Sequence, residues 1–341
     1  MKTEAPGVET AHGAVGLSSV FEKLHGQGLP GLIVGVSGPS GCKTATFGVA
    51  NLETRETMRS GVHFRIGSVS KLIIGLCLRR FLRAGEIELN APVCRYLKDV
   101  PDGEHITIAQ LAQHRTGFTD ALYNPAFRAL INADLGRVWT RDEALQFSFD
   151  VTERAYDPSQ VRYSNTNAMI LAKVIEANAA KPFQEVAAST LAAQIGDHSI
   201  HYVPGPAPSA GFARGYRYGR TDGNIEYGSA FYSTEHFNPS WSAEAGCYAA
   251  TISDLLGLAK SIGSMVEECK DLFTSHEQHY ALLTHAYSPF WGHDGDVPGY
   301  SACCYVRPDD GLAIAVLANL SNTLSGHNPA TLVFQHLICK K

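Results

Sequence analysis

Ser68 and Lys71 are the residues of this chain whose types and spacing most clearly allow chemistry. They lie in the S-x-x-K sequence Ser68-Val69-Ser70-Lys71, which leads into a mostly apolar helical pattern. Positions i and i+3 share one face of a helix, so the hydroxyl and the amine can meet. A serine in the first helical turn also has a free backbone N–H beside it, which can bind an oxyanion. Burial and the helix dipole both disfavour the lysine cation, so we expect Lys71 to act as a base toward a nucleophilic Ser68.

The same pattern occurs a second time, at Ser40-Gly41-Cys42-Lys43. This copy lies in a glycine-rich turn between two strand-like runs, where no helix aligns the serine with the lysine. The tetrapeptide alone is therefore weak evidence, and its context favours Ser68 over Ser40 as the nucleophile. Ser70, inside the first copy, is expected to be a helix residue and not a nucleophile.

Two further motifs accompany Ser68. Tyr163-Ser164-Asn165 forms a Y-x-N sequence, and His293-Asp294-Gly295 forms an H-x-G sequence at a predicted strand. A free tyrosine has a pKa near 10, so a phenolate at Tyr163 would need Lys71 and His293 beside it. Taken singly, the tyrosine and the histidine are more commonly packing residues, and the asparagine a turn former. Their joint occurrence with Ser68 is what indicates a catalytic site.

These three motifs, in this order and at these separations, resemble the serine β-lactamase and penicillin-binding-protein family. That group includes class C β-lactamases, D-alanyl-D-alanine carboxypeptidases, D-amino-acid amidases, D-aminopeptidases and carboxylesterases. The resemblance spans about residues 15 to 335 and includes the flanking sequences Phe64–Gly67, Leu111–Phe118 and Gly246–Leu255. It implies a β-lactamase/transpeptidase-like fold and acyl transfer through an acyl-serine, released by water or by another nucleophile.

The resemblance also implies a role for the matching residues. Tyr163 would be the partner of Lys71 in moving the proton. Asn165 would hydrogen-bond the substrate amide and orient Lys71. The backbone N–H of Asp296 would complete an oxyanion hole with that of Ser68.

The third motif departs from that of family members that bind a carboxylate. Their strand usually presents a hydroxyl or a cation, whereas this one has the sequence His293-Asp294-Gly295-Asp296. A glycine is expected at position 295 because the substrate backbone must lie against the strand there. Asp294 and Asp296 would repel a free carboxylate, unless they point to solvent or pair with Arg307 or another base. The expected substrate is therefore an amide, ester or peptide with a neutral or cationic group at this place.

The preferred function is a serine hydrolase that acts on a small amide, peptide or ester, with D-amino acid derivatives among the candidates. A D-alanyl-D-alanine carboxypeptidase or a β-lactamase is the alternative within the same chemistry, and an acyltransferase would use a second substrate in place of water. A non-catalytic binding protein that keeps the pocket is the alternative of a different class. We expect no cofactor and no metal, because the His276–His279 pair lacks the H-E-x-x-H spacing.

The elements that must position these residues form an α/β (α+β) pattern. Strands are predicted at residues 32–37, 44–50, 300–306 and 312–320, and helices at 15–26, 71–82, 107–113, 141–148, 168–179, 253–266 and 329–339. This order predicts an antiparallel β-sheet flanked by N- and C-terminal helices, with a mainly helical insertion. We assign residues 1–85 and 241–341 to the sheet domain and residues 86–240 to the helical domain, with the active site between them. The segment Glu268–Trp291 is short for the additional strand that is common in the resembled family.

Composition excludes several classes of partner. The chain has 341 residues, 45% of them hydrophobic and 18% charged, with a formal net charge of −5. No lysine or arginine run could follow a nucleic-acid backbone, and no apolar stretch approaches the roughly 20 residues of a membrane span. The N-terminus has no signal-like apolar core, so a cytoplasmic location is expected, or a periplasmic or secreted one if a signal peptide has been removed. The eight cysteines, without any C-x-x-C, are expected to be buried hydrophobes and not disulfides. The oligomeric state is not determined by the sequence.

Overall fold

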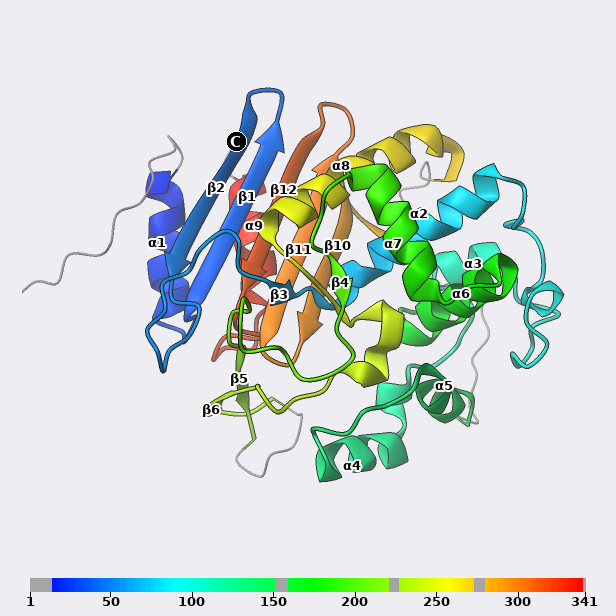
Figure 1. The fold of residues 1–341 in the computed structure, drawn as a ribbon, viewed down its shortest axis with the longest axis horizontal. Coiled ribbons are helices and arrows are strands. Elements are labelled where there is room, and N and C mark those ends of the chain that lie inside the picture. Colours follow the sequence, from blue (N-terminus) through cyan, green and yellow to red (C-terminus); the bar gives the residue numbers. More distant parts are fainter. Residues whose placement is uncertain (1–13, 151–158, 221–226, 273–279, 340–341) are drawn as a thin grey trace, which may run out of the picture.

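A computed structural model describes residues 14–150, 159–220, 227–272 and 280–339. Its centre is a seven-stranded sheet of order β2-β1-β12-β11-β10-β9-β8, in which every neighbouring pair is antiparallel (Figure 1). The two ends of the chain therefore meet in one sheet, because β1 pairs with β12. The strands are β1 (Gly31–Gly38), β2 (Gly41–Gly48), β8 (Tyr280–Ala281), β9 (Thr284–Tyr287), β10 (Phe290–Val297), β11 (Tyr300–Arg307) and β12 (Leu312–Ala318).

Helices cover both faces of this sheet. The terminal helices α1 (Ala14–His25) and α9 (Pro329–Cys339) lie on one face, and α8 (Ile252–Glu268) lies on the other. Because side chains alternate along a strand, Cys303 packs into the core beneath α9, while its neighbour Cys304 packs into the core beneath α8. These two thiols point apart, and all eight cysteines are free.

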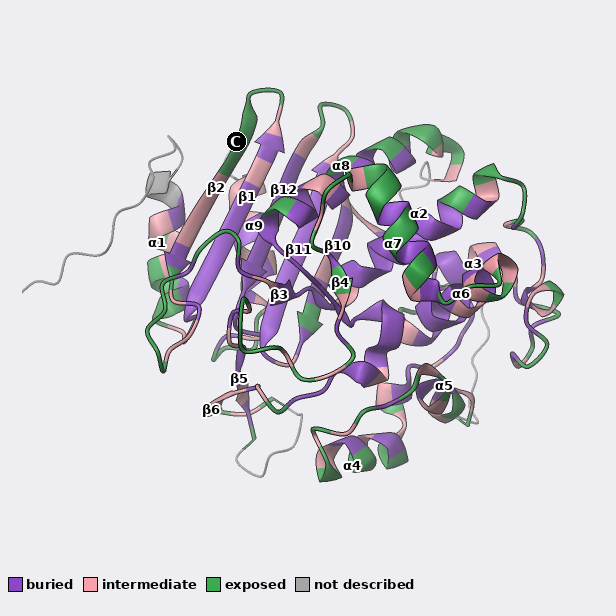
Figure 2. Cartoon of the chain, in the orientation of Figure 1, coloured by how far each residue is buried: buried purple, intermediate pink, exposed green. Residues whose placement is uncertain are grey.

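The remaining elements follow β2 in the chain and precede β8. Among them α2 is central, since it packs against α6, α7 and α8 and is buried over most of its length (Figure 2). The helices are α2 (Ser70–Arg83), α3 (Ile108–Ala112), α4 (Pro125–Ala133), α5 (Arg141–Phe149), α6 (Asn165–Ala179) and α7 (Phe183–Ile195). The short strands are β3 (Phe64–Arg65), β4 (His201–Tyr202), β5 (Tyr216–Gly219), β6 (Ala230–Ser233) and β7 (Tyr248–Ala250).

The predicted fold class is confirmed, and every helix predicted from the sequence is present. Two helices were not predicted, α4 and α7. The start of α4 does carry a sequence signal, because Asn124 accepts hydrogen bonds from two backbone N–H groups of the first turn and Pro125 occupies the first helical position. The segment Glu268–Trp291, which the sequence suggested was short for an additional strand, contains two short strands, β8 and β9.

Candidate active site

Ser68 and Lys71 lie where the chain turns from β3 into α2. Gly67 enters the short 3₁₀ turn Gly67–Val69 with φ +52°, a conformation that favours glycine, and α2 begins at Ser70. The Lys71 Nζ atom is 3.0 Å from Ser68 Oγ. The i, i+3 spacing thus brings the amine and the hydroxyl into contact.

The other candidate serines have no comparable neighbours. Ser40 lies in the exposed turn between β1 and β2. Ser70 is fully buried, and its Oγ accepts a hydrogen bond from the Tyr248 N–H at 3.3 Å. Ser70 therefore ties α2 to β7, as a structural residue of the helix.

Lys71 is completely buried and is held from three sides. Besides Ser68, its Nζ atom lies 2.6 Å from Asn165 Oδ1 and 3.0 Å from the Ala245 carbonyl oxygen. Burial lowers the pKa of Lys71 to about 7, against the opposing charges of Asp120 and Asp294. A neutral amine has two N–H groups and one lone pair. It can donate to Asn165 and Ala245 while its lone pair accepts the Ser68 proton.

Tyr163 contacts the serine from the opposite side. Its Oη atom is 2.6 Å from Ser68 Oγ. Desolvation raises the pKa of Tyr163 well above 10, although the hydrogen bond to Ser68 lowers it. The ring is 37% exposed, which moderates the desolvation without reversing its direction. The Lys71 Nζ atom lies 4.9 Å from the ring centroid, but it is not a fixed cation. The surroundings therefore favour a neutral phenol over the phenolate considered from the sequence.

His293 is also uncharged. It is buried on β10, with its ring centroid 5.9 Å from that of Tyr163. Its Nδ1–H donates to the Asp294 carbonyl oxygen at 2.5 Å. Burial lowers the pKa of His293 to about 4. His293 thus gives no positive charge to Tyr163 near neutral pH, and it presents an apolar ring with an acceptor nitrogen.

Gly295 is required for a reason other than substrate contact. A Cβ atom at Gly295 would lie 2.0 Å from the Ile66 carbonyl oxygen and 3.1 Å from Ser68 N. The space is therefore filled by the turn that precedes the serine, which corrects the expectation that the substrate backbone fills it. In the same way, a Cβ atom at Gly67 would lie 2.8 Å from Asp296 N. The backbones of Ser68 and Asp296 are close neighbours, as the two N–H groups of an oxyanion hole must be.

The edge of β10 beside this turn is open for most of the motif. β9 pairs with β10 only at Phe290, Trp291 and Gly292. Among the described residues, the outer edge of His293–Val297 has no partner strand. An extended substrate segment can therefore pair with this edge next to Ser68.

The two acids of the third motif have different surroundings. Asp294 accepts a hydrogen bond from Tyr305 Oη at 3.2 Å. Arg307, the base considered as a partner from the sequence, instead pairs with Asp310 of its own turn. Asp296 is exposed and lines a cavity of about 360 Å³ together with Arg217 of β5. Desolvation by the walls of this cavity raises the pKa of Asp296 to about 7, although the Arg217 charge lowers it and the exposure limits the effect. The sequence around the motif did not reveal that an arginine from β5 lies beside Asp296.

Two residues between Leu111 and Asp120 support the site, and the sequence did not single them out. Asp120 is buried and accepts the Asn165 N–H at 2.7 Å, which holds the start of α6. His114 is fully buried, and its Nδ1 lies 3.3 Å from the Ser164 N–H and 3.1 Å from Asn167 Nδ2. Its ring centroid is 4.8 Å from that of Tyr163. The only sequence signal for His114 was its place in the family-like flank Leu111–Phe118.

A buried ion network holds the carbonyl group that contacts Lys71. Glu244 precedes Ala245 and is only 4% exposed; its carboxylate lies 3.0 Å from Arg141 Nη1, and Arg141 also pairs with Glu176. Ala243 adopts φ +43°, which is uncommon for a residue with a side chain. The network fixes this constrained segment, so Arg141 and Glu244 are positioning residues for the Ala245 carbonyl group.

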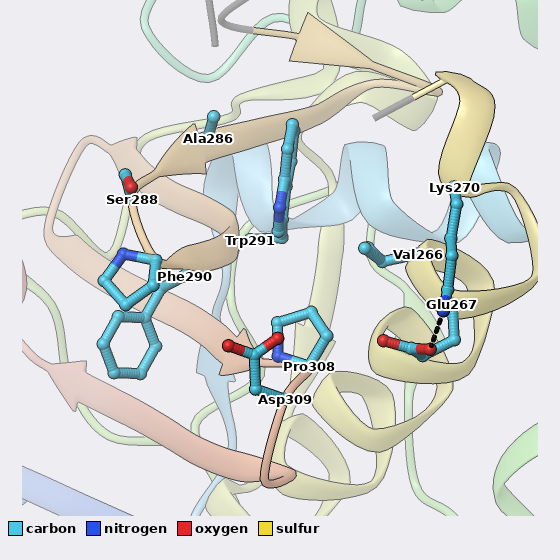
Figure 3. Close-up of a pocket in the computed structure, with 10 residues that line it drawn as sticks. Val266, Glu267, Lys270, Ala286, Ser288, Phe290, Trp291, Pro308 and Asp309 are labelled. Carbon is cyan, nitrogen blue, oxygen red and sulfur yellow. Dashed lines mark ion pairs between the residues drawn. The ribbon is translucent and has the colours of Figure 1, made fainter. Parts of the chain in front are cut away.

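Another cavity, of about 390 Å³, lies away from these groups (Figure 3). It is lined by Trp291 and Phe290 at the start of β10 and by the end of α8, where Lys270 pairs with Glu267 at 3.1 Å. None of the predicted site residues lines it. In the described part of the chain, no group of three or more His, Cys, Asp or Glu side chains could hold a metal ion, and the His276–His279 pair lies outside the described residues.

Comparison with known proteins identifies the family and the fold of the chain. A family model described as Beta-lactamase matches residues 17–337. The chain belongs to the beta-lactamase family. The D-amino acid amidase from Ochrobactrum anthropi SV3 has the same fold, with a TM-score of 0.79 over 95% of this chain and 96% of that chain at 18% identity.

Two curated relatives match shorter parts of the sequence, and both are hydrolases by name. The D-alanyl-D-alanine-carboxypeptidase/endopeptidase AmpH of Escherichia coli is 27% identical over 153 residues, which are 42% of this chain and 37% of that protein. Esterase EstB of Burkholderia gladioli is 37% identical over 76 residues, or 20% of this chain and 19% of that protein. The matches thus span less than two-fifths of the relatives' own lengths. Within the described residues, no helix is long and apolar enough to cross a membrane.

Proposed function

We propose that this protein is a serine hydrolase that cleaves small amides, peptides or esters through an acyl intermediate on Ser68. The observation that supports this most is the position of Ser68 Oγ, in hydrogen-bond contact with both Lys71 Nζ and Tyr163 Oη. Beta-lactamase family membership supports the same reaction class. Derivatives of D-amino acids are included, because a D-amino acid amidase shares the fold over nearly the whole chain.

In the proposed acylation step, Ser68 Oγ attacks the carbonyl carbon of the substrate. Its proton passes to the neutral Lys71 amine, whose other two hydrogen-bonding directions are occupied by Asn165 and Ala245. The negative charge that develops on the carbonyl oxygen is stabilised by the N–H groups of Ser68 and Asp296. When the bond to the leaving group breaks, Tyr163 donates its proton to that group, and the proton that Lys71 took from Ser68 then returns to the Tyr163 phenolate, so that both side chains end neutral.

In the proposed deacylation step, water takes the place of the leaving group and the proton moves in the reverse direction. Water attacks the acyl carbonyl carbon, its proton passes to the Tyr163 and Lys71 pair, and the bond to Ser68 Oγ breaks as Oγ regains a proton. An acyltransferase would use the same step with a second nucleophile. Hydrolysis is preferred because nothing beyond water is required.

The charges around β10 bear on the choice of substrate. Lys71 and His293 provide no fixed cation, Asp294 adds negative charge, and Asp296 adds part of a charge because its pKa is raised to about 7, so an amide or ester suits this place better than a free acid. Arg217 offsets part of that charge and supports a second candidate, a carboxypeptidase whose substrate carboxylate approaches Arg217. We expect kcat/KM for an amide to exceed that for the matched free acid by about tenfold, or 1.4 kcal/mol. A better rate with the free acid would make the carboxypeptidase the correct assignment.

The decisive experiment is intact-protein mass spectrometry after treatment with a fluorophosphonate probe. Wild-type protein and Ser40→Ala should each gain one probe mass, and Ser68→Ala should gain none. Ser40 is the matched control because it lies in the second S-x-x-K sequence, in an exposed turn. Equal labelling of the two variants would refute Ser68 as the nucleophile. The substrate class of the enzyme is then assigned from its activity toward a panel of D- and L-aminoacyl amides, esters and nitrocefin.

A further inference from the structure

A cavity of about 410 Å³ lies between α2 and α7, near the end of α2 that is remote from Ser68. Three arginines of α2 line it: Arg79, Arg80 and Arg83. At a rise of 1.5 Å per residue, Arg80 lies about 18 Å along the helix from Ser68. The cavity is therefore separate from the candidate active site.

Arg80 is held in place without a carboxylate. Its Nη1 atom donates to Ser189 Oγ at 3.0 Å and to Thr190 Oγ1 at 3.3 Å, both on α7. Within the described ranges, no acidic side chain lies at ion-pair distance from Arg80. The two hydroxyls orient the guanidinium group of this exposed residue, whose charge has no ion-pair partner in the described part of the chain.

Arg79 and Arg83 share a single acid. Glu268, at the end of α8, lies 3.2 Å from Arg83 Nη1 and 3.6 Å from Arg79 Nη1. Arg79 is only 3% exposed, and although its Nη2 donates to Gln194 at 2.7 Å, its buried Nη1 makes no hydrogen bond to any described residue. Among the described residues, Glu268 is thus the one carboxylate at ion-pair distance from any of these three arginines, which leaves an excess of two positive charges.

A favourable interaction with the helix dipole does not account for this arrangement. Basic residues near a helix C-terminus need only lie near the last carbonyl groups. Here Arg80 bonds to hydroxyls of another helix, and the buried Arg79 Nη1 atom lies 3.6 Å from Glu268 without a hydrogen bond to any described residue. Burying a guanidinium donor without a partner is unfavourable unless an acceptor is supplied from outside.

We propose that this cavity binds a small multivalent oxyanion of the phosphate type, such as a phosphate monoester. A phosphate group carries nearly two negative charges near neutral pH and three acceptor oxygens. It matches the excess charge and the three guanidinium groups, whose planar donors suit phosphate oxygens. A simple carboxylate has one charge and two oxygens, and it would leave one cation uncompensated.

The test is isothermal titration calorimetry with inorganic phosphate, with sodium acetate and sodium chloride at matched ionic strength as comparison ligands. Wild-type protein should bind phosphate at least about tenfold more tightly than acetate. Arg80→Gln and Arg83→Gln should each weaken phosphate binding by about tenfold, the usual size for a charge-assisted contact. Glu268→Gln should strengthen it several-fold, because it removes the competing anion. Arg59→Gln is the control, since Arg59 is an exposed arginine paired with Glu56 outside the cavity, and should have no effect.

Ser68→Ala separates this proposal from the proposed function. The variant should bind phosphate as the wild type does, whether or not Ser68 is a nucleophile. Equal affinity for phosphate and acetate, or an unchanged phosphate affinity in both arginine variants, would overturn the phosphate site. Weaker binding in Glu268→Gln would overturn it as well, because Glu268 would then be supporting the site and not competing for it.

Discussion

Replacing Lys71 by methionine should remove catalysis and change how stability depends on pH. Lys71 is fully buried, and burial lowers its pKa from 10.5 to about 7. At about 1.4 kcal/mol per pH unit, this difference lowers the free energy of unfolding of the wild type by about 5 kcal/mol at low pH, where the buried amine must be charged. Methionine fills a similar volume and does not titrate. The variant should therefore lack this penalty at every pH.

The sign follows from proton binding in the two states. Between about pH 7 and pH 10.5 the unfolded chain holds the Lys71 proton and the folded protein does not, so raising the pH stabilises the wild type. Below about pH 7 both states are protonated and this contribution stays constant. From pH 7 to pH 9, the wild type should gain about 2 kcal/mol relative to Lys71→Met. The absolute difference between the proteins also contains lost hydrogen bonds, so the change with pH is the quantity to measure.

Urea denaturation of both proteins at pH 7 and pH 9 measures this change. Lys260→Met is the matched control, because Lys260 is an exposed residue of α8 and its loss also removes one positive charge. The control should keep a constant difference from the wild type at the two pH values. If the difference between wild type and Lys71→Met stays constant as well, Lys71 is not a desolvated base and the proposed proton transfer fails.

Three further outcomes test the site. In the wild type, kcat/KM should fall about tenfold per pH unit below about pH 7, because Lys71 must be neutral to accept the proton; a flat profile down to pH 5 would contradict this. Tyr163→Phe and Lys71→Met should each lower kcat at least about 10²-fold. Because both residues act in one proton-transfer network, the double variant should lose far less than the product of the two single losses. A loss equal to that product would mean that the two residues act independently. Gly295→Ala should lower kcat by about 10²-fold or more, because its Cβ atom would meet the Ile66 carbonyl oxygen. Gly61→Ala has open space around it and should be near wild type. Equal stopped-flow rates in the two variants would exclude the contact with Ile66 as the reason for glycine at position 295.

The main elements could be predicted from local patterns, and the exceptions are of two kinds. The strands at both ends of the chain are nearly continuous apolar runs, as expected for a sheet covered on both faces, and such runs and helices such as α2 are local patterns that the sequence displays directly. α4 and α7 were not predicted although both carry local signals, since Asn124 and Pro125 mark the start of α4 and α7 is rich in alanine and other apolar residues. The short strand β9 forms on the edge of β10, and β8 forms on the edge of β9. Segments of two to four residues are too short for a sequence pattern to predict such pairing.

The sequence by itself determined the proposed nucleophile and base, because Ser68 and Lys71 are three residues apart across the turn that leads into α2. This i, i+3 spacing brings Lys71 Nζ to 3.0 Å from Ser68 Oγ. Only the tertiary structure decided the protonation states, since the pKa of Lys71 depends on burial beneath Asn165 and Ala245. It also decided that Arg217, distant in sequence, lies beside Asp296 of the third motif. Spacing is a local property of the chain, whereas desolvation and long-range charge arise only when distant segments pack together.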